Sequence, residues 1–245
     1  MSSRQFIHGF HAITARLRHH PESLQVIYLD QNRHDRRARD LMRAAADRGV
    51  RVILTDGARV DEMARGKSQG VVAQALPIQL ARDLDEVLEN LNEPALLLVL
   101  DGVTDPHNLG ACLRSADAFG VHAVLAPKDR AAGLSAVAVK AASGAAESVP
   151  YFSVTNLSRS LRALRDQGLL CIGADDAAPL TLRDADFTVP AALVLGAEGA
   201  GMRRLTREHC DMLVRIPMYG QVESLNVSVS AGVCLYEARR QRSVS

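Results

Sequence analysis

Residues 191–202 read Ala-Ala-Leu-Val-Leu-Gly-Ala-Glu-Gly-Ala-Gly-Met, an apolar run that stops in a glycine-rich loop. Two further segments, residues 108–114 and 216–228, also follow apolar runs of the kind that form buried strands. Ligands of open α/β sheets bind at the carboxyl ends of the strands. Because all three segments carry polar side chains, we predict that they build one composite site.

The chain from Pro94 onward alternates between short apolar runs and helical patterns. Buried strands that alternate with helices predict an α/β fold, with a mostly parallel sheet covered by helices on both faces. About 150 residues suffice for an independent core. The expected strands are residues 95–100, 122–125, 169–172, 191–195 and 212–216, and the expected helices are residues 109–119, 136–142, 156–167 and 227–240.

A smaller α/β unit is expected over residues 1–77. Its pattern predicts strands at residues 24–29, 50–54 and 71–75 and a helix at 34–48. Residues 78–93 are acidic and carry leucines at helical spacing, which predicts an amphipathic connecting helix that links this unit to a larger domain, residues 94–245.

The net charge of +1 hides an asymmetry between the two parts. Residues 1–77 hold 13 Lys or Arg against 8 Asp or Glu, whereas residues 78–245 hold 16 against 20. Nearly all the basic residues are arginine, whose planar fork suits phosphate and stacks on bases. The first part is therefore either an RNA-binding surface or an ordinary solvated face.

The glycine-rich loop at Gly196 invites comparison with a dinucleotide-binding turn. Its spacing is G-x-x-G-x-G rather than G-x-G-x-x-G, and Glu198 stands where a pyrophosphate would approach. A carboxylate repels phosphate, so the loop favours a ligand without phosphates, such as one with a ribose, an amino group or a sulfonium. A tight turn accounts for some of the glycines but not for Glu198.

The first polar loop leads into an apolar helix. Asn108 lies near the expected helix start, where N-capping is the alternative to a functional role. Arg114 follows on the second turn among apolar residues, and a buried charge requires a partner. A structural ion pair, a substrate phosphate or a catalytic role would each satisfy it.

The third loop is polar and precedes the last helix. Asn226 is positioned to cap that helix, which is rich in small residues such as Ser228, Ala231 and Gly232. Small residues allow another backbone to approach closely, so the helix packs tightly either within the chain or at a subunit interface.

Composition excludes several classes of protein. The longest strongly apolar stretch, residues 95–100, is too short to span a membrane, and the N-terminus has no apolar signal region. The four cysteines are widely spaced, without the pairing typical of a zinc site. We therefore expect reduced thiols, no metal and a cytoplasmic location.

These residues resemble the SpoU (TrmH) family of RNA 2′-O-ribose methyltransferases, because the three segments match its three sequence motifs. Residues 6–12 and 69–73 resemble the N-terminal RNA-binding domain of a subgroup that methylates a guanosine ribose in bacterial large-subunit (23S) ribosomal RNA. The chain departs from that subgroup at Lys67-Ser68-Gln69, where histidine is expected before the glutamine.

The resemblance implies a deep trefoil knot near the C-terminus of the catalytic domain, an exception to the rule against knotted chains. It also implies an N-terminal domain similar to ribosomal-protein-like domains. The expected cofactor is S-adenosyl-L-methionine, and the expected partners are ribosomal RNA and a second copy of the chain, with the active site near the dimer interface. No membrane or DNA partner is expected.

The resemblance also assigns roles by position. The cofactor contacts fall on Gly196, Ile216 and Leu225, largely through backbone groups. The catalytic set falls on Asn108, Arg114, Glu198, Ser224 and Asn226.

A ribose 2′-hydroxyl must lose its proton as it attacks the sulfonium methyl, and the family's usual candidate base corresponds to Arg114. Arginine is normally protonated at every accessible pH. Arg114 is thus either a base made possible by desolvation, or a charged group that binds the adjacent phosphate and stabilises the forming alkoxide. Glu198 is expected to hold it in place.

Two other functions compete with methylation of ribosomal RNA. The same chemistry on transfer RNA is disfavoured by the N-terminal extension, and a non-catalytic RNA-binding ribosome-assembly protein is disfavoured by the complete catalytic set.

Overall fold

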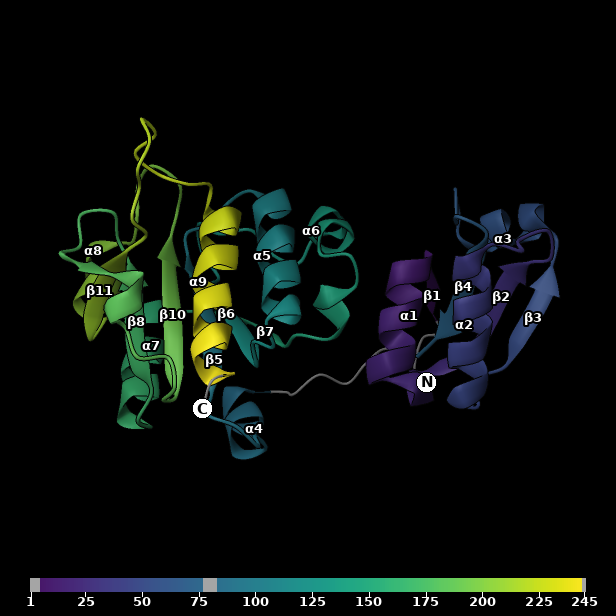
Figure 1. Ribbon diagram of the computed structural model, residues 1–245, viewed down its shortest axis with the longest axis horizontal. Coiled ribbons are helices and arrows are strands. Elements are labelled where there is room, and N and C mark those ends of the chain that lie inside the picture. The colour runs from purple at the N-terminus through teal and green to yellow at the C-terminus, as the bar shows by residue number, and fades with distance from the viewer. Residues whose placement is uncertain (1–4, 77–82, 244–245) are drawn as a thin grey trace. The chain divides into compact units, whose positions relative to one another are not determined.

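The computed structural model describes residues 5–76 and 83–243 (Figure 1). The chain divides into two compact units, Met1–Leu80 and Ala81–Ser245. Each unit has its own sheet and its own hydrophobic core.

The first unit is a four-stranded sheet with strand order β1-β4-β2-β3. Strands β2 and β3 are parallel, whereas β4 runs antiparallel to both β1 and β2. Ile13, Leu17, Ile27 and Leu41 are almost completely buried between the sheet and the helices. The elements are β1 (Gln5–His8), α1 (Phe10–His19), η1 (Pro21–Ser23), β2 (Leu24–Asp30), α2 (Arg36–Asp47), β3 (Val52–Thr55), α3 (Gly57–Met63) and β4 (Val71–Ala75).

The second unit is a seven-stranded sheet in which every recorded strand pair is parallel, with strand order β7-β6-β5-β10-β8-β11-β9. This confirms the predicted parallel α/β architecture, while the knot stays a prediction. The strands are β5 (Leu96–Asp101), β6 (Ala123–Pro127), β7 (Tyr151–Val154), β8 (Leu170–Ala174), β9 (Leu180–Thr181), β10 (Ala191–Gly196) and β11 (Met212–Arg215).

Both faces of this sheet are covered. Along β5, Leu96, Leu98 and Leu100 point into a core shared with α5 and α9, whereas Leu97 and Val99 point into a second core shared with α4 and α7. This alternation explains why the strand is apolar without interruption. The helices are α4 (Leu84–Glu89), α5 (Pro106–Ala118), α6 (Ala136–Ala141), η2 (Ala145–Glu147), α7 (Leu157–Asp166), η3 (Leu182–Asp184), α8 (Arg204–Glu208) and α9 (Val227–Arg242).

The structure modifies the predictions at a few elements. Within the predicted connecting helix, α4 is the helical part and packs against the core of the second unit, while residues 77–82 lie outside the described residues. The sequence pattern did not reveal β1, α1, α3 or β7. The first three belong to short or weakly patterned segments. The N-cap residue of α1 is Gly9, which has no side chain to cap the helix.

Helix α5 starts at Pro106, three residues before the predicted start. The side chain of Asp105 caps it by accepting the backbone N–H of His107, and proline is favoured at the first helical position. Asn108 is therefore inside the first turn, and the alternative that it is the N-cap is wrong.

Gly110 on α5 allows the close approach of α6. A Cβ built at this position would lie 2.5 Å from the carbonyl oxygen of Ala138 and 2.5 Å from the Cβ of Ala141. Both contacts are far inside van der Waals separation, so the helices fit together only with glycine here.

We expect Gly110→Ala to lower the free energy of unfolding, because overpacking costs about 1–3 kcal/mol. Alanine's better helix propensity, worth roughly 1 kcal/mol, offsets only part of this. Urea denaturation measures the change. The matched control is Gly133→Ala, where a Cβ would meet no atom within 4 Å. Equal midpoints for the two variants would contradict the packing argument.

Candidate active site at the carboxyl ends of the strands

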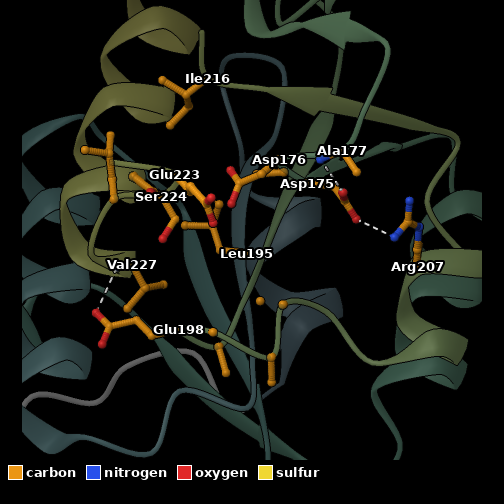
Figure 2. A pocket seen from close by; sticks show the side chains of 18 residues that line it. Asp175, Asp176, Ala177, Leu195, Glu198, Arg207, Ile216, Glu223, Ser224 and Val227 are labelled. Carbon is orange, nitrogen blue, oxygen red and sulfur yellow. Dashed lines mark hydrogen bonds and ion pairs between the residues drawn. The ribbon is translucent and has the colours of Figure 1, made fainter. Parts of the chain in front are cut away.

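A pocket of about 500 Å³ lies at the carboxyl ends of β8, β10 and β11 (Figure 2). Its walls include residues from the second and third predicted segments, so the structure brings these two together. It is lined by Ala174, Asp175, Asp176, Ala177, Leu195, Gly196, Ala197, Glu198, Gly199, Ala200, Gly201, Arg207, Ile216, Glu223, Ser224, Leu225, Val227 and Ser230.

Gly196 lets the loop after β10 fold back on itself. A Cβ at Gly196 would lie 2.1 Å from the carbonyl carbon of Gly201 and 2.2 Å from the backbone nitrogen of Met202. The loop is closed by two backbone hydrogen bonds between Ala197 and Gly201, whose N···O distances are 3.1 and 2.9 Å. Gly196 is thus required for the shape of the loop, in addition to its predicted place in the pocket.

Glu198 joins the three segments. Its Oε1 accepts hydrogen bonds from the side-chain amides of Asn108, at 3.3 Å, and Asn226, and from the backbone N–H of Val227 at 3.2 Å. The Asn226 amide also donates to Oδ1 of Asn108 at 3.1 Å. Three of the predicted catalytic residues therefore form one hydrogen-bonded network.

Asn226 has a second role. Its Oδ1 accepts the backbone N–H of Ser228 at 2.9 Å and the Ser228 hydroxyl at 2.6 Å. This is the predicted cap of α9, and it orients the amide so that Nδ2 points to Glu198. The start of α9 and the glycine-rich loop are thus held by one side chain.

Arg114 is placed differently from the expectation. Its side chain is exposed rather than buried, and it does not line the pocket. Glu198 bonds to Asn108, Asn226 and Val227, so the expectation that Glu198 holds Arg114 is wrong within this chain. Burial was wrongly inferred because Arg114 sits on the solvent side of a helix whose other faces are apolar.

The remaining predicted residues lie in the pocket wall. Ile216, which is partly buried, and the exposed Ser224 come from the loop between β11 and α9 (Figure 2). Leu225, on the same loop, is also partly buried. The role of Ile216 and Leu225 as cofactor contacts stays a prediction.

The wall facing them carries two carboxylates that the sequence reasoning missed. Asp175 accepts the backbone N–H of Ala177 at 2.9 Å and forms an ion pair with Arg207 at 2.7 Å. Asp176 is exposed and lies beside Glu223 and Ser224 in Figure 2. Both follow β8, which had been predicted as a strand, so the rule about strand ends would have found them.

The pocket is acidic. Asp175, Asp176, Glu198 and Glu223 contribute carboxylates, whereas Arg207 is the single basic residue among the lining side chains and is already paired with Asp175. Such a lining disfavours a phosphate and favours a cationic ligand.

Among residues 5–76 and 83–243, the structure contains no group of three His, Cys, Asp or Glu able to hold a metal ion. The four cysteines are unpaired, and burial raises the pKa of the Cys112 and Cys234 thiols to about 12. They are therefore inert packing residues. No helix in the described part is long and apolar enough to cross a membrane.

Comparison with known proteins identifies the family. The profile of the SpoU rRNA Methylase family matches residues 95–236, and that of the RNA 2′-O ribose methyltransferase substrate-binding domain matches residues 6–81. The chain belongs to the SpoU rRNA methylase family. Its three motifs are the segments that meet around Glu198, and the profile match covers both the pocket and the polar network.

Individual relatives extend over the whole chain of this SpoU methylase. The 23S rRNA (guanosine-2′-O-)-methyltransferase RlmB of Nitrosomonas europaea is 59% identical over 244 residues, which cover 99% of this chain and 94% of the relative. RlmB of Ralstonia nicotianae is 59% identical, over 100% of this chain and 98% of the relative.

Among solved structures, the SpoU methyltransferase AviRb of Streptomyces viridochromogenes, in complex with AdoMet, superposes with a TM-score of 0.71 at 28% identity. The match covers 99% of this chain and 92% of AviRb.

We expect Asn226→Asp to slow methyl transfer strongly while preserving the N-cap of α9. Aspartate caps a helix as well as asparagine does, but it replaces the amide donor with a carboxylate that repels Glu198. Transfer rate and urea midpoint are measured together. Asn226→Ala is the comparison, since loss of the cap costs about 1 kcal/mol of stability. A full rate in Asn226→Asp would mean that the network is not needed.

Proposed function

We propose that this protein transfers a methyl group from S-adenosyl-L-methionine to the 2′-hydroxyl of a guanosine ribose in 23S ribosomal RNA. The observation that carries the proposal is the polar network of Glu198, Asn108 and Asn226 at the edge of an acidic pocket. The assignment of 23S ribosomal RNA as the substrate is supported by relatives named 23S rRNA (guanosine-2′-O-)-methyltransferase, which match this chain over nearly its whole length.

The pocket residues fit S-adenosyl-L-methionine. Gly196, Ile216 and Leu225 offer backbone groups and a partly apolar wall for a nucleoside, without a phosphate-binding cluster. The carboxylates of Asp176 and Glu223 suit a ligand that carries positive charge. When bound, this cofactor supplies a methyl group on a cationic sulfonium.

The network of Glu198 then positions the reacting ribose. Asn108 and Asn226 hold the carboxylate in one orientation, so its reorganisation during the reaction is small. Alignment of the attacking oxygen with the methyl and the sulfur accounts for a large part of the rate enhancement. Ser224, on the same loop, lies within the pocket wall and contributes to this positioning.

Arg114 acts as a charged group rather than as a base in this proposal, so the proton of the ribose 2′-hydroxyl passes to solvent as the oxygen takes the methyl group. Arginine side chains carry a positive charge at every accessible pH. A protonated Arg114 binds a phosphate of the substrate and stabilises negative charge on the ribose oxygen.

We propose a homodimer that brings Arg114 to the site. Val229, Val233 and Tyr236 form an apolar stripe along α9, with exposed fractions of 50%, 38% and 60%. The helix that carries Arg114 packs against α9, where a Cβ at Gly232 would lie 3.7 Å from Oγ of Ser115. A second copy that covers the stripe would reduce the exposure of Arg114, and sedimentation of the purified chain tests for the dimer.

The first unit binds the RNA, and the protein acts in the cytoplasm where ribosomal RNA is present. Its excess of arginine supplies phosphate contacts, and RNA outside regular helices is recognised by stacking and by such contacts. Two functions remain as alternatives, methylation of transfer RNA and non-catalytic RNA binding during ribosome assembly.

The first test is a methyl-transfer assay with labelled S-adenosyl-L-methionine on unmodified ribosomal RNA and, separately, on transfer RNA. We expect alkali-resistant label in ribosomal RNA only. Arg114→Ala should lower the rate by about 10²–10³, the usual cost of losing an electrostatic stabiliser. Label in transfer RNA would favour that alternative, and binding without label would favour the assembly protein.

Removal of the first unit should abolish RNA methylation while leaving cofactor binding intact, because the pocket is built entirely from the second unit. Calorimetry with S-adenosyl-L-methionine on residues 81–245 measures the second quantity. An equal loss of cofactor binding would contradict this division of roles.

A further inference from the structure

A second group of charged side chains lies on the other side of the glycine-rich loop from the pocket. Here the loops after β5 and β6 meet Arg203, which precedes α8. A Cβ at Gly102 would lie 3.7 Å from the Cβ of Ala197, 3.8 Å from Nη2 of Arg203 and 3.9 Å from the carbonyl oxygen of Arg130. The group therefore borders the residue that precedes Glu198.

The backbone and side chain of Arg203 are held in place by Asp101. The buried carboxylate of Asp101, at the end of β5, accepts the backbone N–H of Arg203 at 2.8 Å and lies 3.5 Å from its Nε. Arg203 also donates from Nη2 to the carbonyl oxygen of Asp129 at 3.2 Å. Its side chain remains 43% exposed, so its remaining N–H groups are accessible.

The loop that carries Lys128 and Arg130 is fastened at both ends. The backbone N–H of Lys128 donates to Val154 at 2.8 Å, and that of Ala132 donates to Val103 at 2.7 Å. Between them, Arg130 adopts a φ of 55°, a left-handed conformation that is uncommon for arginine. The side chains of Lys128 and Arg130 are exposed, as is that of Asp129 between them, so this loop presents two cations and one carboxylate.

The position of the pocket indicates what these cations bind. The residues that line the pocket come from β8, β10 and the loops that follow them, from α8, from the loop after β11 and from α9, and none of those residues comes from the loops after β5 or β6. In the strand order, β5 and β6 lie on the opposite side of β10. A ribose that meets the cofactor at Glu198 and Asn108 therefore approaches over the ends of β5 and β6.

We propose that Lys128, Arg130 and Arg203 bind the phosphodiester backbone next to the target ribose. This inference rests on the proposed function, because it concerns the RNA substrate of the same site. Every ribose in RNA is flanked by phosphates, and contacts to phosphate set the register of a nucleic acid without reading its bases. Asp101 is a positioning residue that acts through Arg203.

The test uses the full-length double variant Lys128→Gln/Arg130→Asn. Asparagine tolerates the left-handed backbone, so this change removes charge without added strain. We expect a higher KM for ribosomal RNA, with S-adenosyl-L-methionine affinity unchanged. The binding constant K for RNA falls as the salt concentration rises. The slope of log K against log salt should become shallower by about 0.7 for each lost phosphate contact to single-stranded RNA.

The matched control is Arg159→Gln/Arg162→Gln, which removes the same charge from α7 on the opposite face from α5. An equal effect in the control, or an unchanged slope in Lys128→Gln/Arg130→Asn, would overturn the inference. If the double variant loses cofactor affinity, the salt dependence of RNA binding is measured on the single variant Lys128→Gln instead. An inactive wild-type protein would instead contradict the proposed function, so the two failures are distinguishable.

Discussion

The carboxylate of Glu198 holds together three segments that are far apart in the chain. Asn108 is 90 residues away and Asn226 is 28 residues away, yet both donate to the same oxygen. This contact depends on Gly196, since any side chain there would collide with the backbone of Gly201 and Met202. The absence of one Cβ thus allows the turn that carries Glu198 to the other two segments.

Charge is divided between the two sides of this turn. The pocket beside β8 and β11 is lined by carboxylates, and its single arginine is neutralised by Asp175. The loops beside β5 and β6 present Lys128, Arg130 and Arg203. In the proposed complex, the cationic methyl donor and the anionic RNA backbone therefore bind on opposite sides of Glu198.

The parallel sheet makes this division possible. The parallel strands of the second unit end at the same edge, so the loops after β8, β10 and β11 line the pocket and the helix after β5 brings Asn108 to Glu198. The side chains below are packed on both faces, as the alternation along β5 illustrates. Catalytic geometry is thus supported by a rigid core, while the loops supply the chemistry.

Local sequence determined the parallel α/β fold, the three motif loops and the cap of the last helix. Uninterrupted apolar runs identify strands buried on both faces, and Asn226 was identifiable as a cap because capping depends on neighbouring residues only. The glycine spacing with Glu198 excluded a dinucleotide site for a reason that is also local, the repulsion between a carboxylate and a phosphate.

The tertiary structure alone decided which groups meet. We expected Arg114 to be buried and to be held by Glu198. In the structure Arg114 is exposed, and Glu198 accepts hydrogen bonds from the side chains of Asn108 and Asn226. Periodicity reports that a helix has an apolar face, but the direction of one polar side chain depends on which helices pack against it. The strand order likewise placed Asp175 and Asp176 in the pocket and Lys128 and Arg130 outside it, because pairing between distant strands is not encoded in any single segment.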